Sequence, residues 1–530
     1  MKFVEPMRAG AVPVETREGG DPTRTARAAS EKEEDISDIK LPRKYCGCFL
    51  GNEVAIAYNI LGMGRGSEFV SNVYLAGSLI YLACKESGGV DPITNECDDS
   101  NLTVHGGMKP SSLISNIAII SGLLSAFLMP VYGAIVDYTN HRKLMGIISM
   151  MILAAIRCTQ IATIENTWFP MAILQAFAGF IYQVQNVSCY AYLPELAREV
   201  GQERMNNYTA VFTQTQFGSQ AVLMIMVTGI SFGLSLSTVQ TAMVSQAGVF
   251  LWCVVFFPWG WKYLPARPAR HDLKDGQWLI TAGFAQNWNK AKDIWTKHRK
   301  GLKWYFLALI FAEASVSTIT NVSIIYLTDV VGLSITQIGI FFLLALLGSI
   351  PGTNPRTYSC IIAHKTNPNT SWKLSLIFFM VTSVIGAFAF DDMKAPKELS
   401  YIWGTSLGIL LGWFISMESL FFSMCLPQGQ EAEMAGFFIY CSQILTWVPA
   451  LIFTVLVQSN VHQKYGIIST SFGFLIALLF LSCTGTWDEI LAEAGHSNKL
   501  VPVGDDVNQV DASDDLPTSE DGTNECETDL

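Results

Sequence analysis

The chain has 530 residues, of which 50% are hydrophobic and only 15% are charged, and its mean hydropathy is positive at +0.33. This is too little charge to solvate a globular surface of that size, so the composition excludes most soluble classes and indicates a protein that crosses the membrane repeatedly, with no nucleic-acid partner. The formal net charge of −11 is misleading, because residues 488–530 alone hold thirteen acidic residues and one lysine, and the rest of the chain is nearly neutral.

Apolar segments long enough to cross a bilayer recur along the chain. The 25 residues 112–136 carry no charge, and neither do the 57 consecutive residues from Met205 to Trp261, which predict two spans joined by a turn near residues 234–237. Twelve helical spans are expected in all. Their approximate bounds are 66–84, 112–136, 144–164, 169–193, 209–233, 238–261, 304–328, 335–355, 372–390, 399–425, 435–458 and 465–484.

The first span is the least regular. The 40 residues at the start of the chain lack an apolar core, so no cleavable signal is expected and this span would direct insertion. Gly64, Arg65 and Glu68 interrupt its beginning, and residues 54–62 suit a separate interfacial helix.

The loop after the first span carries candidates for modification. Cys84 and Cys97 are the two of the twelve cysteines that share a non-cytosolic loop, so they are a candidate disulfide. The same loop contains Asn101-Leu-Thr103, a glycosylation sequon. We therefore expect this loop to be the modified, non-cytosolic one.

A short motif follows the second span. Gly133-Ala-Ile-Val-Asp137 is followed within six residues by the basic pair Arg142 and Lys143. The glycine would let neighbouring backbones approach, and the carboxylate would meet a helix end or the basic pair, forming a clamp at the membrane surface. The alternative is a plain basic turn on the cytosolic side.

Two further sets of charges lie at helix ends on the same side. Pro194 ends the fourth span, and Glu195 beside Arg198 would act as a gate latch. Glu431 and Glu433 precede the eleventh span, where the helix dipole favours acids. Ordinary capping of helix ends explains both sets equally well.

A long basic loop divides the chain into two groups of six spans. Ten basic residues lie between Lys262 and Lys303, and Trp288, Ile294 and Trp295 lie among them, which suits either an anionic membrane surface or a plain linker. The expected division is an N-terminal tail 1–50, a bundle 51–261, a linker 262–303, a second bundle 304–485 and a disordered acidic tail 486–530.

Ionisable groups at membrane depth are costly and therefore mark a pathway or a partner. Arg157 in the third span is expected to satisfy a structural partner, whereas Glu313 and Glu418 are candidates for a substrate or proton pathway. Gln183 and Asn186 in the fourth span add amides that would either bind a solute or hold helices together.

Orientation follows from the basic residues. With a cytosolic N-terminus, 17 lysines and arginines lie in inner loops and five in outer loops. Both termini are therefore expected in the cytosol.

Three stretches together resemble a known family. The run Tyr190-Ala-Tyr-Leu-Pro-Glu-Leu196, the clamp, and Pro427-Gln-Gly-Gln-Glu-Ala-Glu-Met-Ala-Gly436 are similar to motifs of the autophagy-related vacuolar effluxers, a branch of the major facilitator superfamily. The resemblance implies an all-α membrane protein with twelve transmembrane helices in two six-helix bundles. It also implies that the first, fourth, seventh and tenth helices line the cavity, which favours Glu313 and Glu418 over Arg157. The expected activity is export of amino acids from the vacuole to the cytosol, linked to autophagic recycling.

Other functional classes fit less well. The chain has no phosphate-binding Gly-rich loop with its lysine and no His or Cys pair at metal-ligand spacing, so we expect neither an enzyme nor a bound metal or cofactor. The alternatives are a facilitator for a sugar, nucleoside or organic acid, and, from another class, a receptor or channel. A vacuole or lysosome-like membrane is expected, with the plasma membrane as the alternative, and Glu313 is expected to couple transport to protons.

Overall fold

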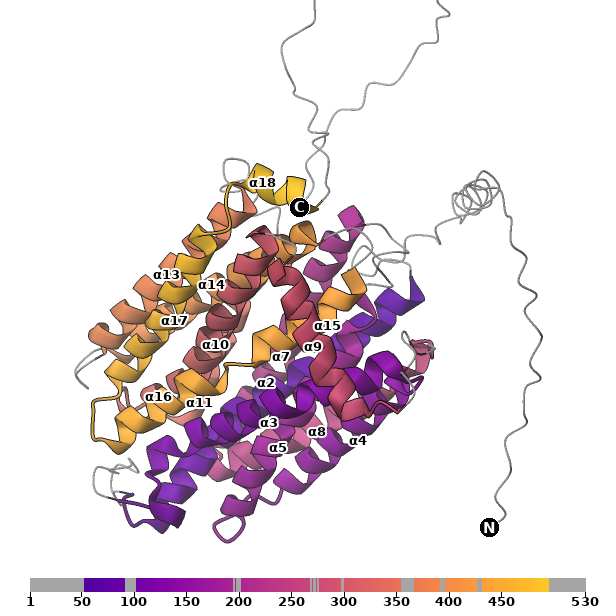
Figure 1. Cartoon of the computed structure of the whole chain (residues 1–530). Helices are drawn as coiled ribbons and strands as arrows, with labels where there is room; N and C mark the ends of the chain where they lie inside the picture. The colour runs from indigo at the N-terminus through magenta and orange to yellow at the C-terminus, as the bar shows by residue number, and fades with distance from the viewer. Residues whose placement is uncertain are drawn as a thin grey trace, which may run out of the picture.

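The computed structural model is a bundle of long helices that run in similar directions (Figure 1). The helices are continuous where the apolar runs are continuous, because a helix satisfies its own backbone hydrogen bonds without water. The structure describes residues 52–90, 102–193, 196, 202–266, 269, 273, 276–296, 300–353, 367–390, 396–426 and 431–494.

Six α-helices are described in the N-terminal half. In it α2 packs against α7 and α8, and α5 packs against α3 and α4. The bounds are α2 (Glu53–Glu86), α3 (Leu113–Tyr138), α4 (Arg142–Gln160), α5 (Trp168–Tyr190), α7 (Gln202–Gly233) and α8 (Thr238–Tyr263).

The C-terminal half repeats this number of spans. Two short helices, α15 and α16, follow one another and cross together as one span, Gly436–Gln458. The bounds are α10 (Lys300–Asp329), α11 (Ile335–Thr353), α13 (Pro368–Ala389), α14 (Lys397–Cys425), α15 (Glu431–Gln443), α16 (Trp447–Gln458) and α17 (Lys464–Ser482). The predicted fold of two six-helix bundles is confirmed.

Ten spans of the described chain are long and apolar enough to cross a membrane, and α2 and α5 are the remaining two helices of the twelve. These two contain 34 and 23 residues, enough for a hydrocarbon core of about 30 Å, but they carry polar side chains that face the interior. Residues 54–62, expected as a separate interfacial helix, are instead the first turns of α2. Arg65 and Glu68 do not interrupt this helix, because both are buried and hydrogen-bonded to partners on other helices.

Glycines bring α11 and α14 into backbone contact. A Cβ atom on Gly408 would lie under 3.0 Å from the carbonyl oxygen of Ala345, and one on Gly412 would lie as close to that of Ser349. Real Cβ atoms do not show such separations. Four-residue spacing of small residues is the usual means of close helix packing in lipid, where dispersion replaces the hydrophobic effect. The two helices therefore pack as a tight pair.

The two halves meet at both ends of the bundle. At the end that carries residues 87–90 and 102–112, here called the loop side, Gln458 and Thr454 of α16 donate hydrogen bonds to Ser112 (3.0 Å) and Ser115 (2.7 Å) at the start of α3. Lys109 also donates to Asn460 there. At the opposite end, the linker side, Ile439 of α15 packs against a cluster of buried side chains from α3 and α5. The members of this cluster are Met129, Tyr132, Val136, Val184 and Val187.

Two α-helices of the described chain, α9 and α18, lie outside the spans. The linker helix α9 (Leu279–Thr296) packs on α3 and crosses the general direction of the bundle (Figure 1). After the last span, α18 (Trp487–Ala494) packs against α10 and α14. Ordered structure thus continues past residue 485, where the acidic tail was expected to begin, because Ile490 and Leu491 are buried and Glu493 accepts a hydrogen bond from the Gly301 backbone (2.9 Å).

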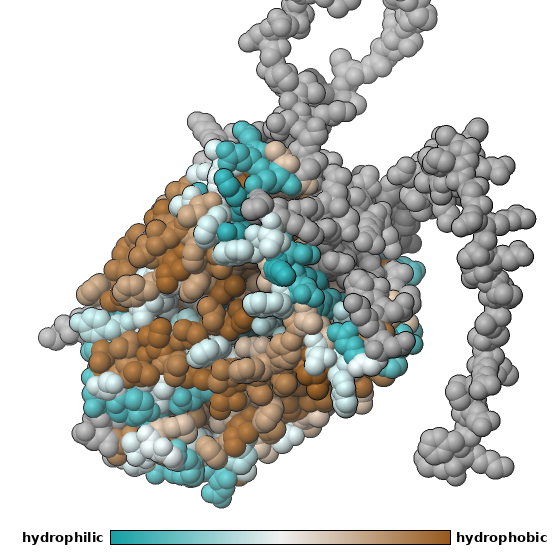
Figure 2. Space-filling model, viewed as in Figure 1, coloured by the Kyte–Doolittle hydropathy of each residue, from teal (hydrophilic) through white to brown (hydrophobic). Residues whose placement is uncertain are grey.

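The surface agrees with a membrane environment. Figure 2 shows hydrophobic side chains over the flank of the bundle, with hydrophilic ones toward its ends and along the course of α9. Exposed large apolar residues on the spans include Phe127, Met151 and Phe472. Such a belt is expected of a protein whose flank contacts lipid.

Candidate functional site

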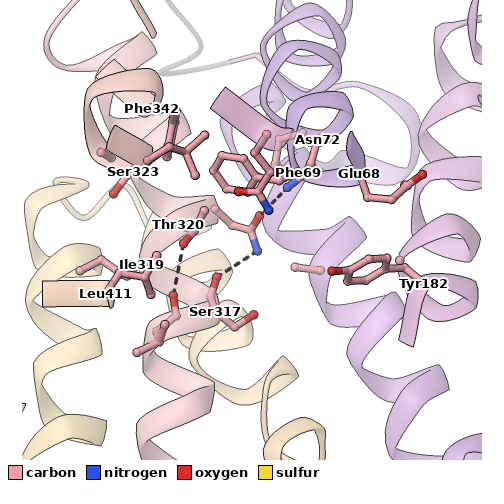
Figure 3. A pocket seen from close by; sticks show the side chains of 18 of the residues that line it. Glu68, Phe69, Asn72, Tyr182, Ser317, Ile319, Thr320, Ser323, Phe342 and Leu411 are labelled. Atoms are coloured by element: carbon pink, nitrogen blue, oxygen red, sulfur yellow. Dashed lines mark hydrogen bonds between the residues drawn. The ribbon is translucent and has the colours of Figure 1, made fainter. Parts of the chain in front are cut away.

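A cavity of about 400 Å³ lies between the two halves. It is lined by α2, α3, α4, α5 and α7 on one side and by α10, α11, α13 and α14 on the other, so both halves contribute to it. Most of the wall is apolar, as Phe69, Phe342 and Leu411 illustrate in Figure 3. Cavities with an apolar wall and a few polar groups are typical of small-molecule sites.

A buried ion pair forms part of the wall. Arg157 of α4 donates from Nε to Glu68 Oε2 of α2 at 2.9 Å, and its Nη2 contacts the same oxygen. Both side chains are at most 5% exposed. Removing two charges from water is costly unless every remaining donor is satisfied. Here Nη1 of Arg157 donates to Gln160 (2.6 Å) and to Gln175 (2.7 Å).

A chain of amides leads from this ion pair into the other half of the protein. Gln175 of α5 donates to Asn72 of α2, and Asn72 donates to Asn321 of α10, each at 3.2 Å. Asn321 in turn donates to the backbone oxygen of Ser317 at 3.3 Å. Figure 3 shows the last two of these bonds. The Asn72–Asn321 bond joins the two halves through the cavity itself.

A second buried arginine lies one turn from Glu68, toward the linker side. Arg65 donates to Asn186 Oδ1 (3.2 Å), and its guanidinium lies 5.3 Å from the ring centre of Tyr58 and 5.4 Å from that of Tyr190. Asn186 donates to Gln183 at 3.1 Å, and Gln183 lines the cavity. The predicted amides of the fourth span therefore connect the cavity to this arginine and its two aromatic partners.

The two predicted glutamates lie together, on the linker side of the cavity. Glu313 of α10 and Glu418 of α14 are hydrogen-bonded through their carboxyl groups, and Tyr305 donates to the backbone oxygen of Glu418 (3.2 Å). Neither glutamate is among the residues that line the cavity. Two carboxyl groups in contact can share a proton, whereas two ionised carboxylates in the same place would repel each other. The alternative that Glu313 pairs with Arg157 is not what the structure shows, because Arg157 pairs with Glu68.

The residues of the predicted clamp contact three different segments. Asp137 accepts a hydrogen bond from Gln286 of α9 (3.0 Å). Arg142 donates to the backbone oxygen of Ala191 (3.3 Å), and Lys143 donates to that of Leu264 (2.6 Å). Among the described residues, no atom outside the surrounding turns of α3 lies within 4 Å of the position that a Cβ on Gly133 would take, so the described part of the chain shows no close backbone approach there.

Several predicted residues are not placed. Glu195, Arg198, Asn101 and Cys97 lie outside the described residues. Glu431 and Glu433 lie in the first turn of α15, as their proposed dipole interaction requires, but only their backbone is described. Cys84 is disulfide-bonded, and its pairing with Cys97 stays a prediction.

Three polar residues of α2 were not predicted to take part in the site, although two of them, Glu68 and Asn72, line the cavity. Arg65, Glu68 and Asn72 are spaced at three and four residues, so they lie on one face of a helix, and this spacing was the available signal. Arg65 and Glu68 were interpreted as interruptions at the start of the first span.

The comparisons with known proteins extend over most of the chain. The family described as "Vacuole effluxer Atg22 like" matches residues 95–488. The crystal structure of the human organic anion transporter MFSD10 (TETRAN) is similar with a TM-score of 0.51 and 14% identity, covering 81% of this chain and 99% of that one. A mutant of the nucleoside transporter NupG gives a TM-score of 0.49 and 14% identity, covering 83% and 99%. No curated protein matches the sequence. At such identities the likeness to MFSD10 shows the fold alone.

Proposed function

Because the chain belongs to the Atg22-like vacuole effluxer family, we propose that this multi-pass membrane transporter moves amino acids from the lumen of a vacuole or lysosome-like compartment to the cytosol. Transport would proceed by alternating access, in which two bundles rock around a fixed central site. The recycling of amino acids during autophagy is the physiological role that we infer.

The observation that carries the proposal is the pairing of opposite charges at the cavity wall. A free amino acid is a zwitterion, and Glu68 and Arg157 offer a carboxylate for its ammonium group and a guanidinium for its carboxylate. The amides of Gln175, Asn72 and Asn321 add donors and acceptors beside this pair. The largely apolar remainder of the wall suits a neutral side chain.

The charge of the wall also bears on the alternatives. An organic acid is best bound by an arginine whose charge is not already compensated, whereas the charge of Arg157 is compensated by Glu68. A sugar or a nucleoside carries no charge that would use the ion pair. A zwitterion therefore matches the site better than these solutes.

The proton shared by Glu313 and Glu418 is the basis of the proposed coupling. These carboxyl groups lie between the cavity and the linker side, and they exchange a proton with water whenever one side of the bundle opens. Loss of the proton would leave two buried negative charges close together, which is unfavourable until the surroundings change. The protonation state of the pair would in this way be tied to the conformation of the bundle.

The gates are proposed on both sides. On the loop side, the hydroxyl and amide bonds from α3 to α16 close the seam. On the linker side, we assign the gate to the clamp residues Gly133, Asp137, Arg142 and Lys143, together with Glu195, Arg198, Glu431 and Glu433.

The proposed orientation places the linker side and both termini in the cytosol. We expect Asn101 to be glycosylated in a eukaryotic host, and tags at either end of the chain to be protected from protease in intact cells. A gel shift on deglycosylation checks the first statement, and antibody access with and without permeabilisation checks the second. A terminal tag that is accessible in intact cells would reverse the assignment.

Uptake into sealed vesicles tests the substrate. Purified protein reconstituted into vesicles should accelerate the flux of labelled neutral amino acids saturably, and a pH gradient should make this flux concentrative. Unlabelled amino acids should compete, and a sugar, a nucleoside and a dicarboxylate should not. Saturable flux of one of those solutes with no amino-acid flux would transfer the assignment to that solute. A flux that does not saturate and shows no exchange would point to a channel.

A further inference from the structure

The linker helix α9 presents three chemically different faces. Ala282, Gly283 and Ile294 are buried against the bundle. A second face is apolar and exposed, and it is formed by Ile280 (56% exposed), Phe284 (43%), Trp288 (73%) and Trp295 (55%). At 3.6 residues per turn these four side chains fall within an arc of about 80°. The remaining exposed face is polar and includes Thr281, Asn289 and Lys292.

Contacts with α3 fix the rotation of α9 about its axis. A Cβ on Gly283 would overlap the backbone of Pro130, so the two helices touch at that point, and Gln286 donates to Asp137 at 3.0 Å. Between them, Pro130 and Asp137 span about 10 Å along α3. Because both contacts lie on the bundle face, the apolar stripe is held pointing away from the bundle.

The position of α9 is next to lipid. Phe127 and Leu128 of α3, one turn from the contact at Pro130, are exposed on the flank of the bundle. The apolar stripe of α9 therefore lies close to the exposed apolar side chains of the helix on which α9 packs. Tryptophan is the residue type most enriched at the boundary between hydrocarbon and headgroups, and an amphipathic helix in that boundary lies about 5–10 Å deep.

The charge of the linker identifies the kind of lipid. Residues 262–303 contain ten basic and three acidic residues. Lys292 and Lys300 are exposed, and Lys303 holds its Nζ 3.6 Å from the ring centre of Trp295, at the end of the apolar stripe. Lysines that flank a buried tryptophan stripe are placed to meet anionic headgroups.

We propose that α9 is a membrane-surface helix whose stripe of Ile280, Phe284, Trp288 and Trp295 enters the leaflet on the linker side and whose flanking lysines bind anionic lipid headgroups. The surrounding lipid thereby holds α9 on α3, where Gln286 contacts Asp137. This inference depends on the membrane-spanning fold and not on the identity of the transported solute.

The first experiment measures the depth of two adjacent side chains in the full-length protein. Cysteine is introduced as Trp288→Cys or Asn289→Cys after the other reactive cysteines are changed to serine, and an environment-sensitive nitrobenzoxadiazole probe is attached. In vesicles that contain phosphatidylserine, the probe at 288 should be quenched by nitroxide-labelled lipids and shielded from aqueous iodide. The probe at 289 should behave in the opposite way. If both probes report water, or both report lipid, the proposed arrangement of faces is wrong.

The second experiment tests the anionic lipid. Lys292→Gln and Lys300→Gln should each lower the ratio of lipid-inserted to water-exposed probe at 288 by about fivefold in vesicles with phosphatidylserine. The two substitutions should have no effect in pure phosphatidylcholine. In phosphatidylserine vesicles, molar salt should remove the difference between the variants and the parent protein, because it shortens the screening length to about 3 Å. Lys85→Gln, at an exposed lysine on the loop side, is the matched control and should change nothing. If the three variants behave alike, anionic lipid is not the ligand of α9.

Discussion

The variant Glu68→Ala should lose about 3–5 kcal/mol of stability together with transport, because it leaves the guanidinium of Arg157 buried without its counter-charge. The alanine also opens space beside the cavity. The amides of Gln160 and Gln175 are unchanged and remain as neutral partners of the arginine. Thermal unfolding in detergent and uptake in vesicles measure the two losses separately.

A double variant separates charge from architecture. Glu68→Gln combined with Arg157→Gln removes both charges and keeps hydrogen-bonding groups of similar size, so most of the stability should return. Transport of zwitterions should not return, because neither charge is left to bind them. Glu165→Ala is the control, since its ion pair with Lys85 is exposed and should contribute little. A Glu68→Ala protein as stable and active as the parent would remove the ion pair from the site.

The variant Glu313→Gln should abolish concentrative, pH-driven transport and retain exchange of solute across the membrane. An amide has nearly the shape of a protonated carboxyl group and still forms a hydrogen bond with Glu418, but it has no proton to release. Uptake with and without a pH gradient, compared with exchange at equal pH, shows the two behaviours.

A structural role for the pair predicts something different. In that case Glu313→Gln would lower protein yield and thermal stability and leave the response to pH intact. Glu418→Gln should behave as Glu313→Gln does, because a proton shared by the pair would belong to both groups. Glu398→Gln, an exposed acid in the first turn of the same helix as Glu418, serves as the control. A stable Glu313→Gln protein with full proton-coupled flux would refute the coupling.

Most of the fold follows from uncharged runs in the sequence. The long runs 112–136 and 205–261 can be stable only as helices in lipid, and the structure has helices there. The two ends of the helical region were less predictable. Residues 54–62 and 487–494 carry both polar and apolar side chains, and whether they form a continuing helix or a tail depends on partners far away in the chain.

The sequence shows which charged residues lie at membrane depth, but not which of them pair. Glu313 and Glu418 were predicted as site residues because an acid at membrane depth is costly unless it has a function or a partner. In the structure they lie together, although they are 105 positions apart in the sequence. The same rule applies to Glu68 and Arg157, but sequence spacing carries no information on which of the buried charges meet. Gly133 shows the converse, because its small size suggested a close approach that the described part of the chain does not show.

The contact of α11 with α14 has a mechanical consequence. At Gly408 and Gly412 backbone touches backbone, so there is no layer of side chains that can yield by changing rotamers, and the pair is stiff. The seam between α3 and α16 is made of hydroxyl and amide groups, which exchange protein partners for water at little cost in free energy. The C-terminal half is therefore stiff where α11 and α14 meet through their backbones. The contact between the two halves can change more easily, because it is made by side chains.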